Sequence, residues 1–137
     1  MAFKPIRYDS GKVKSLPMAA SMSATKHQLC KMSSGYLADA VAGDNEVEYI
    51  ALETKTDATA TNAGSYLDVL PIDDEIDIEA LTSIAPVQAT HVGNDYDLTD
   101  LNTVDLDNIT DKVFHIDEIV DATNKLVRGH FNKPAIA

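Results

Sequence analysis

The sequence lacks the cysteine pairs that form disulfides and the long apolar segments that enter membranes. Its 137 residues include one cysteine, six glycines and no tryptophan. Cys30 cannot form an internal disulfide, so we expect it to be either a buried small hydrophobic residue or a free thiol. No apolar run approaches the ~18 residues that span a bilayer, and residues 1–5 lack the apolar centre of a signal peptide. We therefore expect a chain that is made and folded in a cytoplasm and does not bind membranes.

Sequence patterns of the common enzyme classes are also missing. The six glycines are isolated, which excludes phosphate-binding loops and dinucleotide fingerprints. There is no Gly-x-Ser-x-Gly elbow, and no motif ties Cys30 to a catalytic base. We expect no enzymatic activity, no catalytic residues and no cofactor.

The four histidines, at positions 27, 91, 115 and 130, do not have the spacing of metal ligands. His115 and His130 would become cross-strand neighbours if the last two strand-like segments pair, but two histidines make an incomplete zinc site. We therefore expect ordinary surface histidines and no metal ligands.

A cluster of aspartates suggests a calcium site, because hard cations prefer several carboxylate oxygens. An EF-hand is excluded, since counting from Asp95 places Asp100 where the turn glycine belongs and Leu106 where the bidentate glutamate belongs. An irregular calcium site remains an open alternative. The acids concerned are Asp95, Asp97, Asp100, Asp105, Asp107 and Asp111.

The net charge of −11 is distributed unevenly. Residues 1–31 hold six cations and one acid, residues 32–111 hold eighteen acids and one cation, and residues 112–137 hold four cations and three acids. An acidic body is soluble and repels nucleic acid, whereas a basic N-terminal stretch favours an acidic surface. Lys4, Arg7 and Tyr8 are the one grouping of cations with an aromatic ring, and the acidic body opposes them, so we expect no nucleic-acid binding.

Short stretches of alternating character predict an all-β fold, a small β-barrel or β-sandwich. The clearest is 75–81, where Ile76, Ile78 and Ala80 alternate with acids, and 112–117 and 126–131 follow with a turn at 121–124 between them. A hairpin is expected over 27–40, turning at residues 34–35. The predicted core contains Ile76, Ile78, Phe114, Ile116, Val127 and Phe131.

Residues 1–26 read as an extended N-terminal arm, and residues 27–137 as a single β-domain with a short C-terminal tail. Pro5 and Pro17 interrupt the first segment, and it has no sustained helical stripe. Its spaced apolar residues predict that it lies against its own domain or a neighbour. The residues expected to make these contacts are Phe3, Lys4, Ile6, Arg7, Tyr8, Lys12, Lys14 and Leu16.

The order of features in the second half resembles the small head-decoration, or capsid cement, proteins of tailed bacteriophages. The resemblance lies in Val92-Gly93 with Tyr96 and Leu98, then 103–105, 114–116 and 127–131. It implies a β-tulip-like domain with a terminal arm on the outer surface of an icosahedral virion. The implied partners are the major capsid protein and further copies of the chain, as a homotrimer that stabilises the shell.

Two other classes of protein remain open. One is a different β-rich virion or tail component, which would share most of these features. The other is a cytoplasmic β-barrel that binds a small ligand or a metal ion, which would need a pocket.

Overall fold

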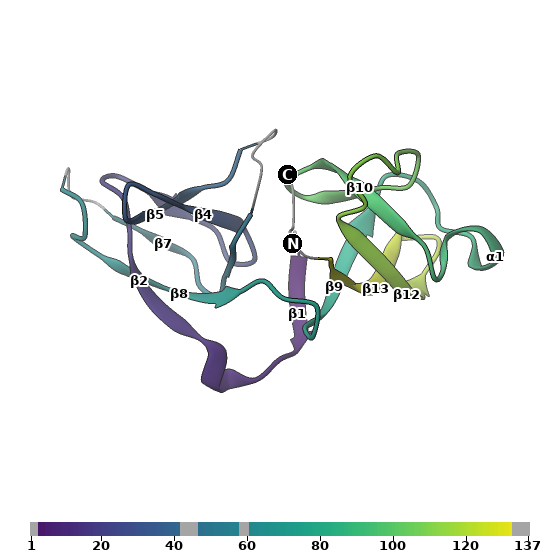
Figure 1. Ribbon diagram of the computed structural model, residues 1–137, viewed down its shortest axis with the longest axis horizontal. Helices are drawn as coiled ribbons and strands as arrows, with labels where there is room; N and C mark the ends of the chain where they lie inside the picture. Colours follow the sequence, from purple (N-terminus) through teal and green to yellow (C-terminus); the bar gives the residue numbers. More distant parts are fainter. Residues whose placement is uncertain (1–2, 42–46, 58–60, 133–137) are drawn as a thin grey trace.

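The computed structural model describes residues 3–41, 47–57 and 61–132, which contain thirteen strands and two short helices. The predicted all-β fold is confirmed, and the strands lie in two lobes with β1 between them (Figure 1). The helices are η1 (Ser10–Lys12) and α1 (Gln88–His91). No helix in these ranges is both long enough and apolar enough to cross a membrane.

The first lobe is built on a six-stranded sheet, sheet A, with the order β1-β9-β11-β10-β12-β13. Because β9 also pairs with β13, the five strands β9 to β13 close into a barrel, and β1 pairs with β9. The strands of sheet A are β1 (Phe3–Arg7), β9 (Asp77–Thr82), β10 (Asp95–Asp100), β11 (Thr103–Asp105), β12 (Phe114–Asp121) and β13 (Leu126–Phe131).

The second lobe is a five-stranded sheet, sheet B, with the order β2-β8-β6-β4-β5. A parallel bridge between Met18 and Leu37 joins its two ends, so this sheet also curls toward closure. A two-stranded ribbon of β3 and β7 accompanies it. The strands are β2 (Lys14–Pro17), β3 (Ser23–Ala24), β4 (Leu29–Ser33), β5 (Tyr36–Asp39), β6 (Tyr49–Ala51), β7 (Lys55–Thr56) and β8 (Tyr66–Pro71).

The core of sheet A is aromatic. Phe3, Phe114 and Phe131 pack with ring centroids 5.0–6.0 Å apart, in the tilted and edge-on arrangements that aromatic quadrupoles favour. The buried cluster around them extends to Leu29 and Ile50 of sheet B, so the two lobes share one apolar core. All six predicted core residues are at most 1% exposed, which confirms that prediction.

A second apolar cluster fills the other face of sheet B. Met18, Leu37 and Leu67 are fully buried in it, and so is Cys30, which confirms the reading of this cysteine as a small core residue. Burial raises the pKa of the Cys30 thiol to about 12, because the apolar surroundings disfavour a thiolate.

The extended N-terminal arm was a wrong prediction for the described residues. Residues 3–7 and 14–17 are strands β1 and β2 within the two sheets, and Phe3 is 0% exposed. The boundary at residue 27 therefore separates no structural unit. Pro5 led to this error, but proline is excluded only from central strands, and β1 is an edge strand.

Candidate functional site

The residues predicted as an attachment arm divide into two groups. Phe3 is in the core, Leu16 packs against the second cluster, and the Lys12 ammonium lies 3.1 Å from both Asp73 and Glu75. Those three are therefore engaged within the chain. The side chains that remain exposed are Lys4, Ile6, Arg7, Tyr8 and Lys14.

Three of the aspartates predicted as an alternative calcium site accept hydrogen bonds from backbone N–H groups. Asp97 is buried and accepts hydrogen bonds from the backbone N–H groups of Asp111 and Lys112, whereas Asp100 and Asp105 each cap a turn two residues on. Among the described residues, no group of three or more His, Cys, Asp or Glu side chains has a geometry that could hold a metal ion.

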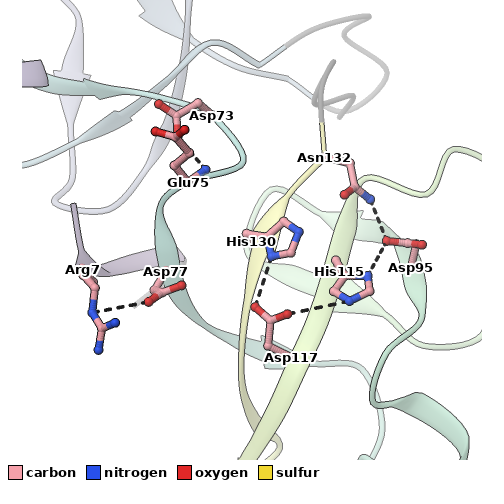
Figure 2. Close-up of polar contacts among 9 residues, drawn as sticks. All are labelled: Arg7, Asp73, Glu75, Asp77, Asp95, His115, Asp117, His130 and Asn132. Carbon is pink, nitrogen blue, oxygen red and sulfur yellow. Dashed lines mark hydrogen bonds and ion pairs between the residues drawn. The ribbon is translucent and has the colours of Figure 1, made fainter. Parts of the chain in front are cut away.

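A different polar cluster lies on the outside of the sheet A barrel. His115 on β12 and His130 on β13 are directly opposite each other, with stacked rings 5.0 Å apart (Figure 2). This confirms the predicted cross-strand neighbours. Asp95, at the start of β10, pairs with His115 on the edge of β12 that faces away from β13.

Carboxylates surround the two imidazoles. His115 Nδ1 lies 2.8 Å from Asp95 Oδ1, and its Nε2 lies 3.7 Å from Asp117 Oδ1. His130 Nδ1 lies 3.1 Å from the other oxygen of Asp117. Asn132 completes the cluster, because its amide donates to both Asp95 Oδ1 and the carbonyl of Lys112, each at 2.8 Å. Figure 2 shows the contacts from Asn132 through Asp95, His115 and Asp117 to His130 as one connected chain.

Asp117 lies in this cluster because it is two residues from His115 on β12, and alternate residues of a strand point to the same face. The pairing of β12 with β13 shifts between Ile116 and Glu118, so Asp117 is the extra residue in the ladder. A regular strand would turn consecutive residues to opposite faces, whereas Asp117 and Glu118 are both exposed here. The bulge therefore leaves Glu118 exposed beside Asp117, which sequence alternation cannot reveal.

The neighbouring row of the same sheet is an ion-pair ladder. Arg128 on β13 lies opposite Glu79 on β9 and Glu118 on β12, with N–O distances of 3.5 and 3.4 Å. Arg7 on β1 lies 3.6 Å from Asp77 in the same way. In these rows two arginines therefore face three acids across the strands.

The cluster also affects the ionisation of Asp95. Partial burial works to raise the pKa of this carboxyl, but hydrogen bonds from Asn132 and His115, together with the charges of His115 and Lys112, outweigh burial and hold its pKa below the ordinary value.

The cluster is a network of polar side-chain contacts and contains no nucleophile. The contacts made by both imidazoles go to carboxylates, which orient the rings.

Comparison with known proteins gives no family to which the chain can be assigned: no family model matches it, and no curated protein matches it.

Proposed function

We propose that the chain is a structural virion protein that binds the outer surface of an icosahedral phage capsid and stabilises it. In this proposal it is not an enzyme, and its partners are the major capsid protein and two further copies of itself. The resemblance of residues 92–131 to head-decoration proteins suggests this role, and three features of the described residues support it.

The first feature is the filled interior. Phe3, Phe114 and Phe131 occupy the space that a ligand-binding barrel would keep open. This favours a structural role over the small-ligand alternative.

The second feature is that both sheets leave few strand edges unpaired. The sheet A barrel is closed, and the Met18–Leu37 bridge joins the ends of sheet B. Exposed edges invite strand pairing between copies. A protein that coats a shell at high local concentration benefits from having few of them.

The observation that carries the proposal is an exposed strip on the N-terminal segment. Ile6 and Tyr8 are each 39% exposed, and the exposed cations Lys4, Arg7 and Lys14 lie close to them in the chain. The rest of the chain is strongly acidic, so this strip differs in character from the body that carries it. Such a strip fits an acidic partner surface with apolar sites.

The free energies indicate how the strip would work. Exposed charge pairs contribute only ~0–1 kcal/mol each, whereas full burial of a large apolar side chain contributes ~1.5–3 kcal/mol. Ile6 and Tyr8 are therefore expected to dominate affinity, and the cations to set the association rate and its salt dependence. Attachment would occur through a rigid face and not through folding of an arm.

Co-sedimentation with undecorated shells of the phage that encodes the chain tests the proposal. We expect the double variant Ile6→Ser/Tyr8→Ser to bind at least ~10-fold more weakly than the wild type, which corresponds to ~1.4 kcal/mol. Val120→Ser is the matched control, because Val120 is 43% exposed but lies on β12. Equal binding by the double variant and the control would place attachment elsewhere, and failure of the wild type to bind any shell would refute the proposed function.

Assembly is tested separately. Sedimentation equilibrium of the full chain, with and without shells, distinguishes a preformed trimer from one that assembles on the capsid. A chain that stays monomeric in both conditions would contradict the proposed homotrimer while leaving capsid binding to its own test.

A further inference from the structure

Residues 80–94 are the longest stretch of the sequence without Asp, Glu, Lys or Arg, in a chain of which 24% of the residues are charged. Much of this stretch lies at the surface. Ile84 is 40% exposed and Val87 is 52% exposed, and the residues at positions 85, 88, 89 and 90 are exposed beside them. We call the exposed side chains of residues 84–90 the uncharged tip.

The uncharged tip differs from the other places where the described residues expose a large apolar side chain. The nearest charged residue in the chain to Ile84 is Glu79, and Val87 lies eight positions from both Glu79 and Asp95. Backbone contacts bring Lys125 to the base of the segment, where its carbonyl accepts the Thr82 N–H at 2.9 Å. Each of the other exposed large apolar residues has a charged residue within two positions, and these are Ile6, Tyr8, Val41, Tyr66, Ile109 and Val120.

Hydrogen bonds hold the tip in one conformation. His91 Nδ1 accepts from the Val87 N–H at 2.8 Å, and the His91 N–H donates back to the Val87 carbonyl at 2.8 Å. The Thr90 carbonyl accepts from the Asn94 amide at 2.7 Å and from the Tyr96 hydroxyl at 3.3 Å. A surface that is already ordered loses little conformational entropy when a partner covers it.

The tip is also separate from the exposed strip on the N-terminal segment. Helix α1, which contains residues 88–90 of the tip, lies at one end of the molecule's longest axis (Figure 1). Strand β1, which contains Lys4, Ile6 and Arg7 of the strip, lies between the two lobes (Figure 1). One surface can therefore be covered while the other is engaged elsewhere.

We propose that the uncharged tip is the surface through which copies of this chain contact one another. A second copy has the same net charge of −11, so contact through an acidic face opposes like charges. At the tip, two copies can remove apolar side chains from water without that repulsion. Ile84 and Val87, with the uncharged Gln88 and Thr90 beside them, have the apolar centre and polar rim of an interface. This inference names the self-contact of the homotrimer proposed above and rests on that proposal for the number of copies.

The contact between free copies should be weak, because the tip is small. Stable interfaces involve about 20–30 residues on each side, whereas the tip spans only residues 84–90. Copies held side by side on a shell reach an effective concentration on the order of 1 mM, at which a weak contact forms. We therefore expect cooperative binding to a shell, in which the strip attaches each copy and the tip joins neighbouring copies.

Heteronuclear NMR of the full chain locates the contact. Between micromolar and millimolar protein at high salt, the backbone amide signals within residues 84–90 should shift with concentration. The amide signals of Ile6 and Val120 should not shift. Spectra that do not change up to millimolar protein would overturn the proposal, and so would shifts confined to the strip.

Salt dependence separates an apolar contact from a charged one. Raising the salt concentration from ~0.01 M to ~1 M shortens the Debye length from ~30 Å to ~3 Å. This screens the repulsion between copies and leaves apolar burial intact, so self-association measured by sedimentation equilibrium should strengthen several-fold. Self-association that weakens with salt would mean that the strip of one copy binds an acidic face of another, and would overturn the proposal.

Two matched variants test the tip itself. Val87→Glu and Val120→Glu each add one negative charge at an exposed valine, so the two variants have the same net charge. Val87→Glu should self-associate at least ~10-fold more weakly than Val120→Glu, because the contact would then cover an unpaired carboxylate. Equal self-association would overturn the proposal. Melting curves establish that both variants fold, and if Val87→Glu does not, the NMR and salt measurements on the wild type decide.

Shell binding distinguishes failure of this inference from failure of the proposed function. At low occupancy, where bound copies have no neighbours, Val87→Glu should bind shells as tightly as the wild type, and near saturation it should bind several-fold more weakly. Loss of binding at low occupancy would assign the tip to the shell protein and overturn the self-contact. If the wild type binds no shell, the proposed function fails, and the solution measurements still decide whether the tip joins copies.

Discussion

Gly129 lies against the backbone of His115 so closely that a Cβ atom at Gly129 would be 1.8 Å from the His115 carbonyl oxygen. The same Cβ would be 2.7 Å from the Phe114 ring. Gly129 is buried on β13 opposite Ile116, beside the bulge at Asp117. The absence of a side chain here is what lets β12 approach β13 while presenting both histidines outward.

Replacement of Gly129 by alanine should therefore be strongly destabilising. Because the obstructing atoms belong to backbone and to a core ring, the strand must move, and overpacking of this kind costs ~1–3 kcal/mol or more. Urea unfolding measures the loss, with Gly11→Ala as the control, since a Cβ at Gly11 meets only the exposed Asp9 side chain. Equal stability of the two variants would show that β12 can shift without strain.

Asp95 should support stability above its unfolded-state pKa and lose that contribution in acid. Its folded pKa is lowered from an ordinary value of 3.8, so the unfolded chain binds a proton more readily, and stability falls as the pH drops from about 5 through the folded pKa. Asp95→Asn should lower the melting temperature at pH 7 and reduce the further fall of the melting temperature below pH 4. Asp74→Asn, at an exposed position, should leave both unchanged. If the melting temperature of Asp95→Asn fell with acid as steeply as that of the wild type, the Asp95 carboxylate would not contribute to stability.

Cys30 should resist thiol reagents while the chain is folded. Its side chain is 0% exposed and its pKa is raised to about 12, so at pH 8 little thiolate forms and none is accessible. Labelling with iodoacetamide along a urea gradient should follow the unfolding curve measured by circular dichroism. Rapid modification in the absence of urea would mean that the second cluster opens locally.

Chelation of divalent cations should leave the melting temperature unchanged. Asp95 contacts His115, Asp97 accepts from the N–H groups of Asp111 and Lys112, and Asp100 and Asp105 cap their own turns, so no shared point collects these carboxylates. A melting curve with excess EDTA should overlay one with millimolar calcium. A loss of several degrees on chelation would restore the irregular calcium site as the better hypothesis.

The parts of this fold that sequence reasoning predicted are those where alternation is local. Ile76, Ile78 and Phe114 alternate with polar residues, and the Ser34–Gly35 turn supplies positive φ where the β4–β5 hairpin needs it. The pairing of His115 with His130 followed from the turn at residues 121–124 alone. Local pattern sufficed in these cases because each strand partner is close in the chain.

The parts that were missed depend on distant partners. Nothing in residues 3–7 indicates that Phe3 completes an aromatic core with rings more than a hundred residues away. The bulge at Asp117 and the role of Asn132 likewise arise from register, which sequence alternation does not contain. Helix α1 has no side-chain N-cap signal, since Val87 occupies that position.

Two side chains of β1, Phe3 and Ile6, differ in burial and so distinguish a core strand from a surface arm. Phe3 is 0% exposed between Phe114 and Phe131, whereas Ile6 on the same strand is 39% exposed. Phe3→Ala should therefore lower the free energy of unfolding by ~3–5 kcal/mol, the usual cost of truncating a buried phenylalanine.

Ile6→Ala is the internal control and should cost less than ~1 kcal/mol, because little apolar area leaves the interior. Both values come from urea unfolding of the full chain. Deletion of residues 2–20, which an arm would tolerate, should abolish cooperative unfolding, since it removes β1, β2 and the buried Met18. A truncated chain that still melts cooperatively near the wild-type temperature would show that β1 and β2 add little to the fold, and would return the N-terminal segment to the role of an arm.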